Sequence, residues 1–175
     1  MSGPTALQPP VGVTLLPVTT AREMHQAVMS HVAEYRVFIA VAAVADWRVA
    51  SVSTQKIKKQ DGRMPALEFE QNPDILADVA ALPSAPYCVG FAAESQDLIK
   101  HAREKLARKK VSLIVANVGP ETFGRDDNAL TLFDDHGVHE LARAPKDVIA
   151  RQLVSHIAKL LDGAKKRAKR AAKGR

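Results

Sequence analysis

The run "RVFIAVAAV" (residues 36–44) decides the expected fold, because it is a nearly continuous series of β-branched and small apolar residues. A strand that faces water on one side alternates apolar and polar residues, and this run shows no such alternation. It is therefore typical of a strand that is covered on both faces in a parallel sheet. The run leads directly into Asp46 and then, ten positions later, into the basic segment "KIKK" (residues 56–59).

Upstream of this run, the pattern predicts a strand followed by a helix. Four prolines by position 17 indicate an extended entry that leads into a short strand over residues 11–18. The segment "TTAREMHQAVMSHVAEY" (residues 19–35) then opens on Thr19 or Thr20 as an N-cap and continues with apolar residues at helical spacing.

Downstream, strands and helices continue to alternate. The segment "ALEFEQ" (residues 66–71) alternates as a strand does, and "NPDILADVAAL" reads as a helix with Asn72 as its N-cap and Pro73 at its first helical position. Two further buried strands, "YCVGFAA" (residues 87–93) and "VSLIVAN" (residues 111–117), flank an amphipathic helix over residues 95–110.

The pattern changes after Asn117, where two short strands are predicted in "ALTLFDDHGVHELAR" (residues 129–143) around a turn at Asp135. A closing helix follows in "APKDVIARQLVSHIAKLLDG" (residues 144–163). Alternating helices and buried strands predict a Rossmann-like, three-layer α/β fold with a mostly parallel sheet and an antiparallel hairpin near the C-terminal part.

The positive charge of the chain is concentrated at its end. The net charge is +6, but residues 163–175 hold seven of the 25 basic residues, which leaves 18 against 19 acidic residues in the body. We therefore expect one nearly neutral domain over residues 1–162 and a basic tail that is either a frayed helix extension or, as we favour, disordered. Such a tail attracts RNA or a membrane surface only occasionally.

Several classes of function find no support in the sequence. No apolar run approaches the roughly 20 residues of a membrane span, and the first residues lack a signal-peptide pattern, so a cytoplasmic protein is expected. The lone Cys88 is interpreted as a core residue. Glycine-rich phosphate loops and Cys/His metal spacings are absent from the sequence, and its six histidines show no ligand arrangement.

Three predicted strand ends carry polar residues, namely Asp46, Glu94 and Asn117. Ligands of open α/β sheets bind beyond the carboxyl ends of the strands, so these residues mark a candidate site. Small residues before Asp46 would let a flat ligand approach the backbone, and the acid could hold a divalent cation beside phosphates. Pairing of Asp46 with Arg48 is an equally good explanation from spacing alone.

Basic residues offer a second set of candidates. Lys56 lies in a polar segment that also contains Lys58 and Lys59, and this segment is either a loop that closes on phosphate or an ordinary solvated loop. Lys105 and Lys109 are four residues apart, so both project from one helix face, where they suit a polyphosphate. A solvated basic face is the commoner explanation of that pair.

A family resemblance favours the ligand-binding interpretation of these residues. In order along the chain, the motifs "AAVADWR", "KIKK", "NPDIL", "VGFAAES", "AREKLARKK", "LIVAN" and "FGRDDNALTLF" resemble the phosphopantothenoylcysteine synthetase of bacterial coenzyme A synthesis. That domain is the C-terminal half of a bifunctional flavoprotein, and the resemblance covers about residues 10–160. It implies a ligase that joins 4′-phosphopantothenate to cysteine with CTP, through an acyl-cytidylate and release of pyrophosphate.

The resemblance also implies site residues. Lys56 would stabilise the reacting phosphate as the catalytic residue, and Asp46 would serve both the nucleotide and its Mg²⁺. The residues implied to bind CTP are Ala40, Val41, Ala42, Asp46, Lys56, Pro73, Asp74, Ile75, Leu76, Phe91, Lys105 and Lys109.

The family pattern begins with a strand, a glycine-rich segment and an asparagine that should precede residue 9, so part of the acyl-substrate site and the flavin-dependent decarboxylase half are expected to lie outside this chain. No flavin is therefore expected here. The resemblance further implies a homodimer, for which residues 117–143 are a candidate interface. The alternative to a ligase is a non-catalytic nucleotide-binding or assembly module whose basic tail binds RNA or a partner.

Overall fold

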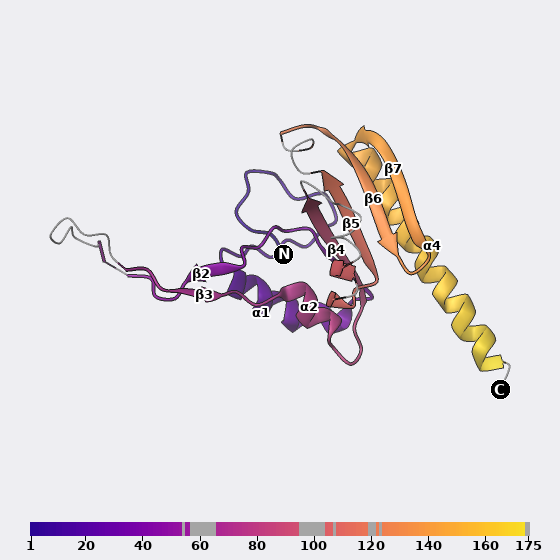
Figure 1. Cartoon of the computed structure of the whole chain (residues 1–175), viewed down its shortest axis with the longest axis horizontal. Coiled ribbons are helices and arrows are strands. Elements are labelled where there is room, and N and C mark those ends of the chain that lie inside the picture. The colour runs from indigo at the N-terminus through magenta and orange to yellow at the C-terminus, as the bar shows by residue number, and fades with distance from the viewer. Residues whose placement is uncertain are drawn as a thin grey trace.

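A single sheet organises the molecule (Figure 1). The computed structural model describes residues 1–53, 55–56, 66–94, 104–106, 108–118, 122 and 124–173. The five strands of the main sheet lie in the order β1-β4-β5-β6-β7. Their bounds are Val37–Ala40 (β1), Tyr87–Glu94 (β4), Leu113–Val118 (β5), Asp127–Asp134 (β6) and Gly137–Pro145 (β7). Strands β1, β4 and β5 are parallel, whereas β6 and β7 form an antiparallel hairpin at one edge, which confirms the predicted fold class.

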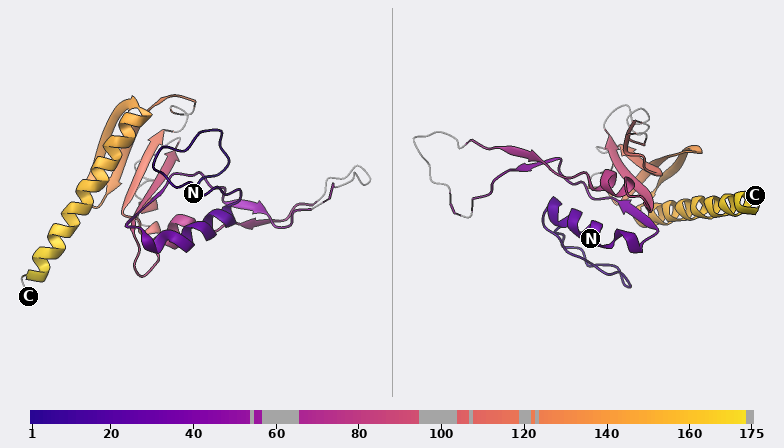
Figure 2. Two further views of the ribbon diagram at one scale, coloured as in Figure 1. Left: turned by 180° about the vertical axis from the view of Figure 1, so that it is seen from behind. Right: turned by 90° about the horizontal axis from the view of Figure 1, so that it is seen from below.

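Helices cover both faces of this sheet (Figure 2). Helix α1 (Ala21–His31), the short 3₁₀ helix η1 (Val32–Glu34) and helix α2 (Ile75–Ala80) pack on one face. Helix α4 (Lys146–Lys173) packs on the other face, against the hairpin. The result is the three-layer arrangement that alternating strands and helices predict.

Successive side chains of the central strands feed two separate cores, because side chains of a strand point alternately to its two faces. In β4, Cys88 and Ala92 belong to the core under α1 and α2, whereas Val89 belongs to the core under α4. In β5, Ile114 and Leu113 divide in the same way. Both strands are covered on both faces, as their continuous apolar sequences predict.

A separate two-stranded sheet forms an arm that extends away from the body (Figure 1). It pairs β2 (Trp47–Val49) with β3 (Phe69–Gln71) in antiparallel orientation. The strand that was predicted over residues 66–71 is therefore shorter, and it lies outside the main sheet. Its pairing depends on β2, which the sequence pattern did not indicate.

The predicted strand over residues 36–44 is corrected in two respects. It ends at Ala40, and it is not covered on both faces as predicted, because Ile39 is exposed on a strand that pairs with β4 at the edge of the described sheet. The predicted strand over residues 11–18 is also wrong, since an isolated bridge between Ser2 and Pro17 is the β-pairing present there. Prolines lack the N–H that a ladder needs, and this segment is largely exposed, so little burial favours a strand.

Helix starts were predicted with mixed success. Thr20 caps α1 in a capping box with Glu23, which confirms the prediction for Thr20. Helix α2 is capped by Asp74 instead of Asn72, because the Asp74 side chain accepts the N–H of Ala77. Pro73 therefore lies before the cap instead of at the first helical position.

The remaining predicted helices are described in part. The helix predicted over residues 95–110 lies partly outside the described residues, and residues 104–106 and 108–109 are helical. Helix α4 continues to Lys173, so residues 163–173 of the basic tail form a helix extension. Within the described residues, no helix combines the length and the apolar character needed to cross a membrane.

Candidate active site

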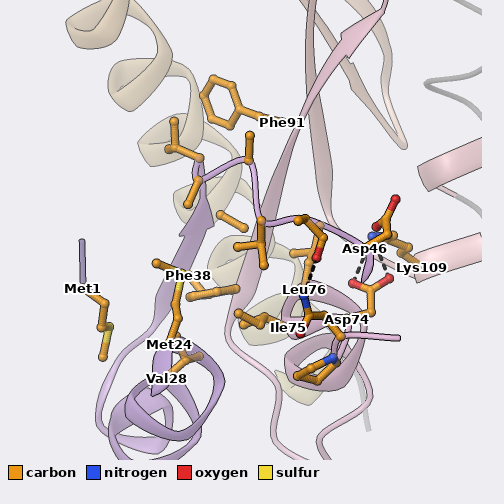
Figure 3. A pocket seen from close by; sticks show the side chains of 18 of the residues that line it. Met1, Met24, Val28, Phe38, Asp46, Asp74, Ile75, Leu76, Phe91 and Lys109 are labelled. Atoms are coloured by element: carbon orange, nitrogen blue, oxygen red, sulfur yellow. Dashed lines mark hydrogen bonds and ion pairs between the residues drawn. The ribbon is translucent and has the colours of Figure 1, made fainter. Parts of the chain in front are cut away.

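A cavity of about 610 Å³ opens where the carboxyl end of β1 meets the start of α2 (Figure 3). One part of its wall is apolar and comes from α1, β1 and α2. Met24, Val28, Phe38, Ile75 and Leu76 contribute the side chains there. The segment that follows β1, residues 41–46, forms the adjoining wall with small side chains. This position at a strand end is where open α/β sheets bind ligands.

Charged groups gather at the other end of the cavity, where Figure 3 shows Asp46, Asp74 and Lys109 close together. The Lys109 Nζ atom lies 2.9 Å from Asp74 Oδ1 and 2.8 Å from Asp74 Oδ2. Burial acts to raise the pKa of Asp74, but the hydrogen bonds from Lys109 and from the Ala77 backbone, with the charges of Lys109 and Arg108, hold that pKa below its ordinary value. Asp74 is therefore an anion that neutralises Lys109 in this structure.

A second lysine reaches the cavity beside β4. The Lys105 Nζ atom donates a hydrogen bond of 3.2 Å to the carbonyl oxygen of Phe91. The Phe91 side chain packs with the core under α4, although the residue lines the cavity. Lys105 and Lys109 both line the cavity, so their four-residue spacing does place them on one face.

Asn72 holds the wall segment in place, a role that the sequence did not indicate. Its Nδ2 atom donates to the Ala45 carbonyl at 2.8 Å, and its backbone N–H donates to the Asp46 carbonyl at 2.8 Å. Its Oδ1 atom accepts a hydrogen bond of 2.9 Å from Arg48. These bonds help to explain why the chain leaves β1 after Ala40, because residues 45 and 46 bond to Asn72 before α2.

Arg48 does not engage Asp46 in the way that the alternative explanation required. Its guanidinium forms a salt bridge with Glu70 across the β2–β3 pair and a further hydrogen bond with the Gln71 carbonyl. Asp46 is exposed and lines the cavity. The spacing Asp46-Arg48 could not reveal this, since the partner of Arg48 lies in another strand.

The structure brings almost all of the predicted binding residues to one cavity. Ala40, Val41, Ala42, Asp46, Pro73, Asp74, Ile75, Leu76, Phe91, Lys105 and Lys109 all line it. Lys56 does not line it, and is an exposed residue that follows β2 on the arm. The neighbouring Lys58 and Lys59 lie outside the described residues.

Two groups of lining residues were missed by the sequence analysis. Met24 and Val28 were identified only as the apolar face of a helix, and that face turns out to be shared between the core and the cavity. Phe38 was likewise identified only as an apolar strand residue, and it too is shared between the core and the cavity. No local signal separates a core position from a cavity wall, because both require apolar side chains.

The cavity has the chemical division that a nucleotide requires. Its apolar walls and small residues can enclose a planar base, and its lysines can neutralise phosphate oxygens. Cys88 is not a nucleophile of this site, because it is 2% exposed within the core and burial raises the pKa of its thiol.

Comparisons with known proteins agree with this geometry. The family model "DNA/pantothenate metabolism flavoprotein C-terminal domain" matches residues 1–161. The chain is 47% identical over 155 residues to the coenzyme A biosynthesis bifunctional protein CoaBC of Vibrio cholerae, and covers 39% of it. It is 43% identical over 163 residues to the Escherichia coli CoaBC protein, and covers 40% of that protein. The chain thus spans about two fifths of the length of these relatives, while 86% and 90% of the chain itself is matched.

A solved structure shows the same fold. The crystal structure of the C-terminal domain of a CoaBC protein superimposes with a TM-score of 0.76 at 33% identity, over 92% of this chain and 72% of that one. The resemblance noted in the ordered motifs is therefore confirmed. The chain belongs to the family of DNA/pantothenate metabolism flavoprotein C-terminal domains and is homologous to the C-terminal region of CoaBC.

Proposed function

We propose that this chain supplies the nucleotide site of a CTP-dependent phosphopantothenate–cysteine ligase of coenzyme A biosynthesis. The observation that carries the proposal is the cavity, because one wall is apolar and the opposite end holds Lys105, Lys109 and Asp46. A cytidine base fits the apolar wall beside residues 40–42, and the triphosphate fits the basic end. Homology to the CoaBC proteins supports the choice of reaction.

The reaction proceeds in two steps. A carboxylate oxygen of 4′-phosphopantothenate attacks the α-phosphorus of CTP, the bond from that phosphorus to the bridging oxygen breaks, and pyrophosphate leaves. The cysteine amine then attacks the acyl carbon, loses a proton, and displaces CMP to give 4′-phosphopantothenoyl-cysteine. Negative charge accumulates on phosphate oxygens in the first step, so positioned cations lower its barrier.

Lys109 and Lys105, which both line the cavity, are the cations that we assign to this task. The Lys109 ammonium is already held at the cavity by Asp74 at 2.8 Å, which limits the entropy lost when it binds phosphate. Lys105 is anchored through the Phe91 carbonyl at 3.2 Å. Lysine acts here as a compact point charge, which suits a flexible triphosphate chain.

Asp46 would hold Mg²⁺ together with phosphate oxygens. Its exposed carboxylate at the cavity rim fits that ion, since Mg²⁺ usually binds one or two carboxylates, substrate phosphates and water. The ion would supply charge neutralisation to the triphosphate. The protein's own part is to keep the Asp46 backbone fixed, which Asn72 does through its 2.8 Å hydrogen bond.

Lys56 is proposed as the residue that acts most directly on the reacting phosphate. It lies away from the cavity in this structure, so this role requires the arm to bring it to a nucleotide. In a form of the enzyme that includes the whole acyl-substrate site, Lys56→Ala should lower kcat, and an unchanged rate would remove the residue from the mechanism. A homodimer formed through residues 117–143 and association with a decarboxylase domain are parts of the same proposal.

Titration calorimetry with CTP and ATP in the presence of MgCl₂ tests the nucleotide site. We expect CTP to bind more tightly than ATP, and Lys109→Met to weaken CTP binding by about tenfold through loss of a charge-assisted bond. Lys159→Met is the matched control, because it removes the same charge from an exposed position on α4. Equal affinity for the two nucleotides, or no binding of either, would contradict the proposal and favour an assembly module instead.

A further inference from the structure

A second group of polar side chains lies on the α4 face of the sheet, apart from the cavity. Asp134 ends β6, His139 lies in β7, and His156 lies in α4. Their potential ligand atoms all lie within 4.8 Å of one another. We propose that these three residues form a binding site for a divalent transition metal of the zinc class. The interpretation that the histidines have no ligand arrangement is thereby corrected, since the three residues meet only in the folded chain.

The carboxylate of Asp134 is oriented for such a site. Its Oδ1 atom accepts the backbone N–H groups of His136 at 2.7 Å and Gly137 at 3.1 Å, which fixes the side chain in the hairpin turn. Its Oδ2 atom then points between the two imidazoles, 3.3 Å from His139 Nε2 and 3.2 Å from His156 Nε2. One oxygen and two ring nitrogens therefore converge on one point.

These separations match the edges of a tetrahedral metal site. Bonds of about 2.0–2.2 Å from zinc to nitrogen and oxygen ligands place neighbouring ligand atoms roughly 3.3–3.5 Å apart. The distance of 3.3 Å from Asp134 Oδ2 to His139 lies at the lower limit of this range, and the distance of 3.2 Å to His156 lies just below it. The ligand atoms, all within 4.8 Å of one another, would need to adjust around a shared cation.

Burial also favours a built site over a surface coincidence. The side chain of Asp134 is 3% exposed and that of His156 is 19% exposed, whereas His139 is 38% exposed. The buried Leu153 and Ile157 flank His156 on α4 and hold its helix face against the sheet. The exposure of His139 leaves the cluster accessible to an ion from solvent.

The donor set distinguishes this site from the proposed Mg²⁺ site at Asp46. Two imidazole nitrogens and one carboxylate oxygen suit Zn²⁺, Co²⁺ or Ni²⁺, whereas Mg²⁺ prefers oxygen ligands. Because the ligands come from a hairpin and from α4, the ion would fasten that helix to the edge of the sheet. The inference is independent of the proposed ligase activity, since it uses none of the cavity residues.

Calorimetric titration of the untagged chain with ZnCl₂ tests this inference. We expect one ion per chain, and an affinity loss in His156→Gln that exceeds the roughly 10–100-fold typical of removing a mere supporting partner of a ligand. His25→Gln is the matched control. It removes a histidine that pairs with an aspartate, Asp78, at 2.9 Å but does not belong to the three-residue cluster. Zn²⁺ should raise the Tm of the parent chain and of His25→Gln, but not that of His156→Gln.

A spectroscopic readout separates metal binding from a simple hydrogen-bonded triad. Co²⁺ bound in a tetrahedral nitrogen and oxygen site should develop visible absorption in the parent chain and lose it in Asp134→Asn. If His156→Gln does not fold, His139→Gln supplies the same test from the more exposed position. Absence of Zn²⁺ binding in the parent chain, or equal binding by His156→Gln and His25→Gln, would overturn the inference.

Discussion

The two faces of the main sheet are built from the same strands, yet one is closed and the other is hollowed. On the α4 face, β4 presents Val89 and β5 presents Leu113 and Val115, all fully buried. On the α1–α2 face, the same strands present Cys88, Ala92, Ile114 and Ala116 to a second buried core, and the cavity opens beside that core at the end of β1. The cavity lies on that second face.

The comparison indicates that small residues where a strand ends leave room for a ligand site beside a closed core. Large apolar residues fill the layer under α4 to the density that protein interiors require. Small residues near the ends of β1 and β4 leave space that the short helix α2 does not fill. A strand can therefore stabilise the fold with one face and shape a site with the other.

The largest expected effect comes from the closed face. Leu132→Ala removes a side chain with 0% exposure and should lower the free energy of unfolding by roughly 2–5 kcal/mol, because the surroundings cannot refill the space. Leu76→Ala, at the cavity wall, should cost less, since the space it leaves joins an existing cavity. Urea denaturation of both variants measures the difference, and equal losses would contradict the contrast between the faces.

A smaller loss of stability is expected from Gly90→Ala, on the face of the sheet that carries the cavity. A Cβ atom added at Gly90 would lie 2.5 Å from Leu76 Cδ2 and 3.1 Å from Ile114 Cδ1. Gly90→Ala should therefore cost about 1–3 kcal/mol of stability and push Leu76 towards the cavity, which weakens CTP binding.

Two further variants test whether crowding at Gly90 causes these losses. Introducing Leu76→Ala into the Gly90→Ala background should recover part of the lost CTP affinity, because it removes the displaced side chain. Gly163→Ala is the control, since nothing lies within 4 Å of a Cβ atom placed there. If Gly163→Ala lowers the Tm as much as Gly90→Ala does, crowding is not the cause.

The smallest effect concerns the charged end of the cavity. Since the pKa of Asp74 is lowered in the folded state, its ion pair with Lys109 contributes stability above the ordinary value of 3.8, and this contribution is lost as the pH falls through the folded pKa. The Asp74 side chain is nearly half exposed, so solvent limits the contribution to about 0.2–1 kcal/mol.

Asp74→Asn isolates the charge, because asparagine is an equally good helix cap. The variant should be slightly less stable than the parent at pH 7, and the two should converge below pH 4 in chemical denaturation. A difference that persists at low pH would mean that the cap, not the ion pair with Lys109, stabilises the start of α2.

Short-range patterns predicted much of the fold but not its exact limits. The continuous apolar sequences of β4 and β5 indicated buried parallel strands, and the Thr20 box indicated the start of α1. The end of β1 and the cap of α2 were predicted wrongly, because Asn72 bonds across the chain to residues 45 and 46. A local pattern contains no information about such a partner.

The same distinction holds for the sites. Local periodicity predicted the alternation of strands and helices and the edge hairpin, because each depends on neighbours within a few positions, whereas the resemblance carried by the ordered motifs implied most residues of the cavity. Tertiary structure decided that Lys56 lies away from the cavity, that Asp74 neutralises Lys109, and that Asp134 meets two histidines. Those contacts join residues far apart in the chain, and only the packing of helices on the sheet brings them within bonding distance.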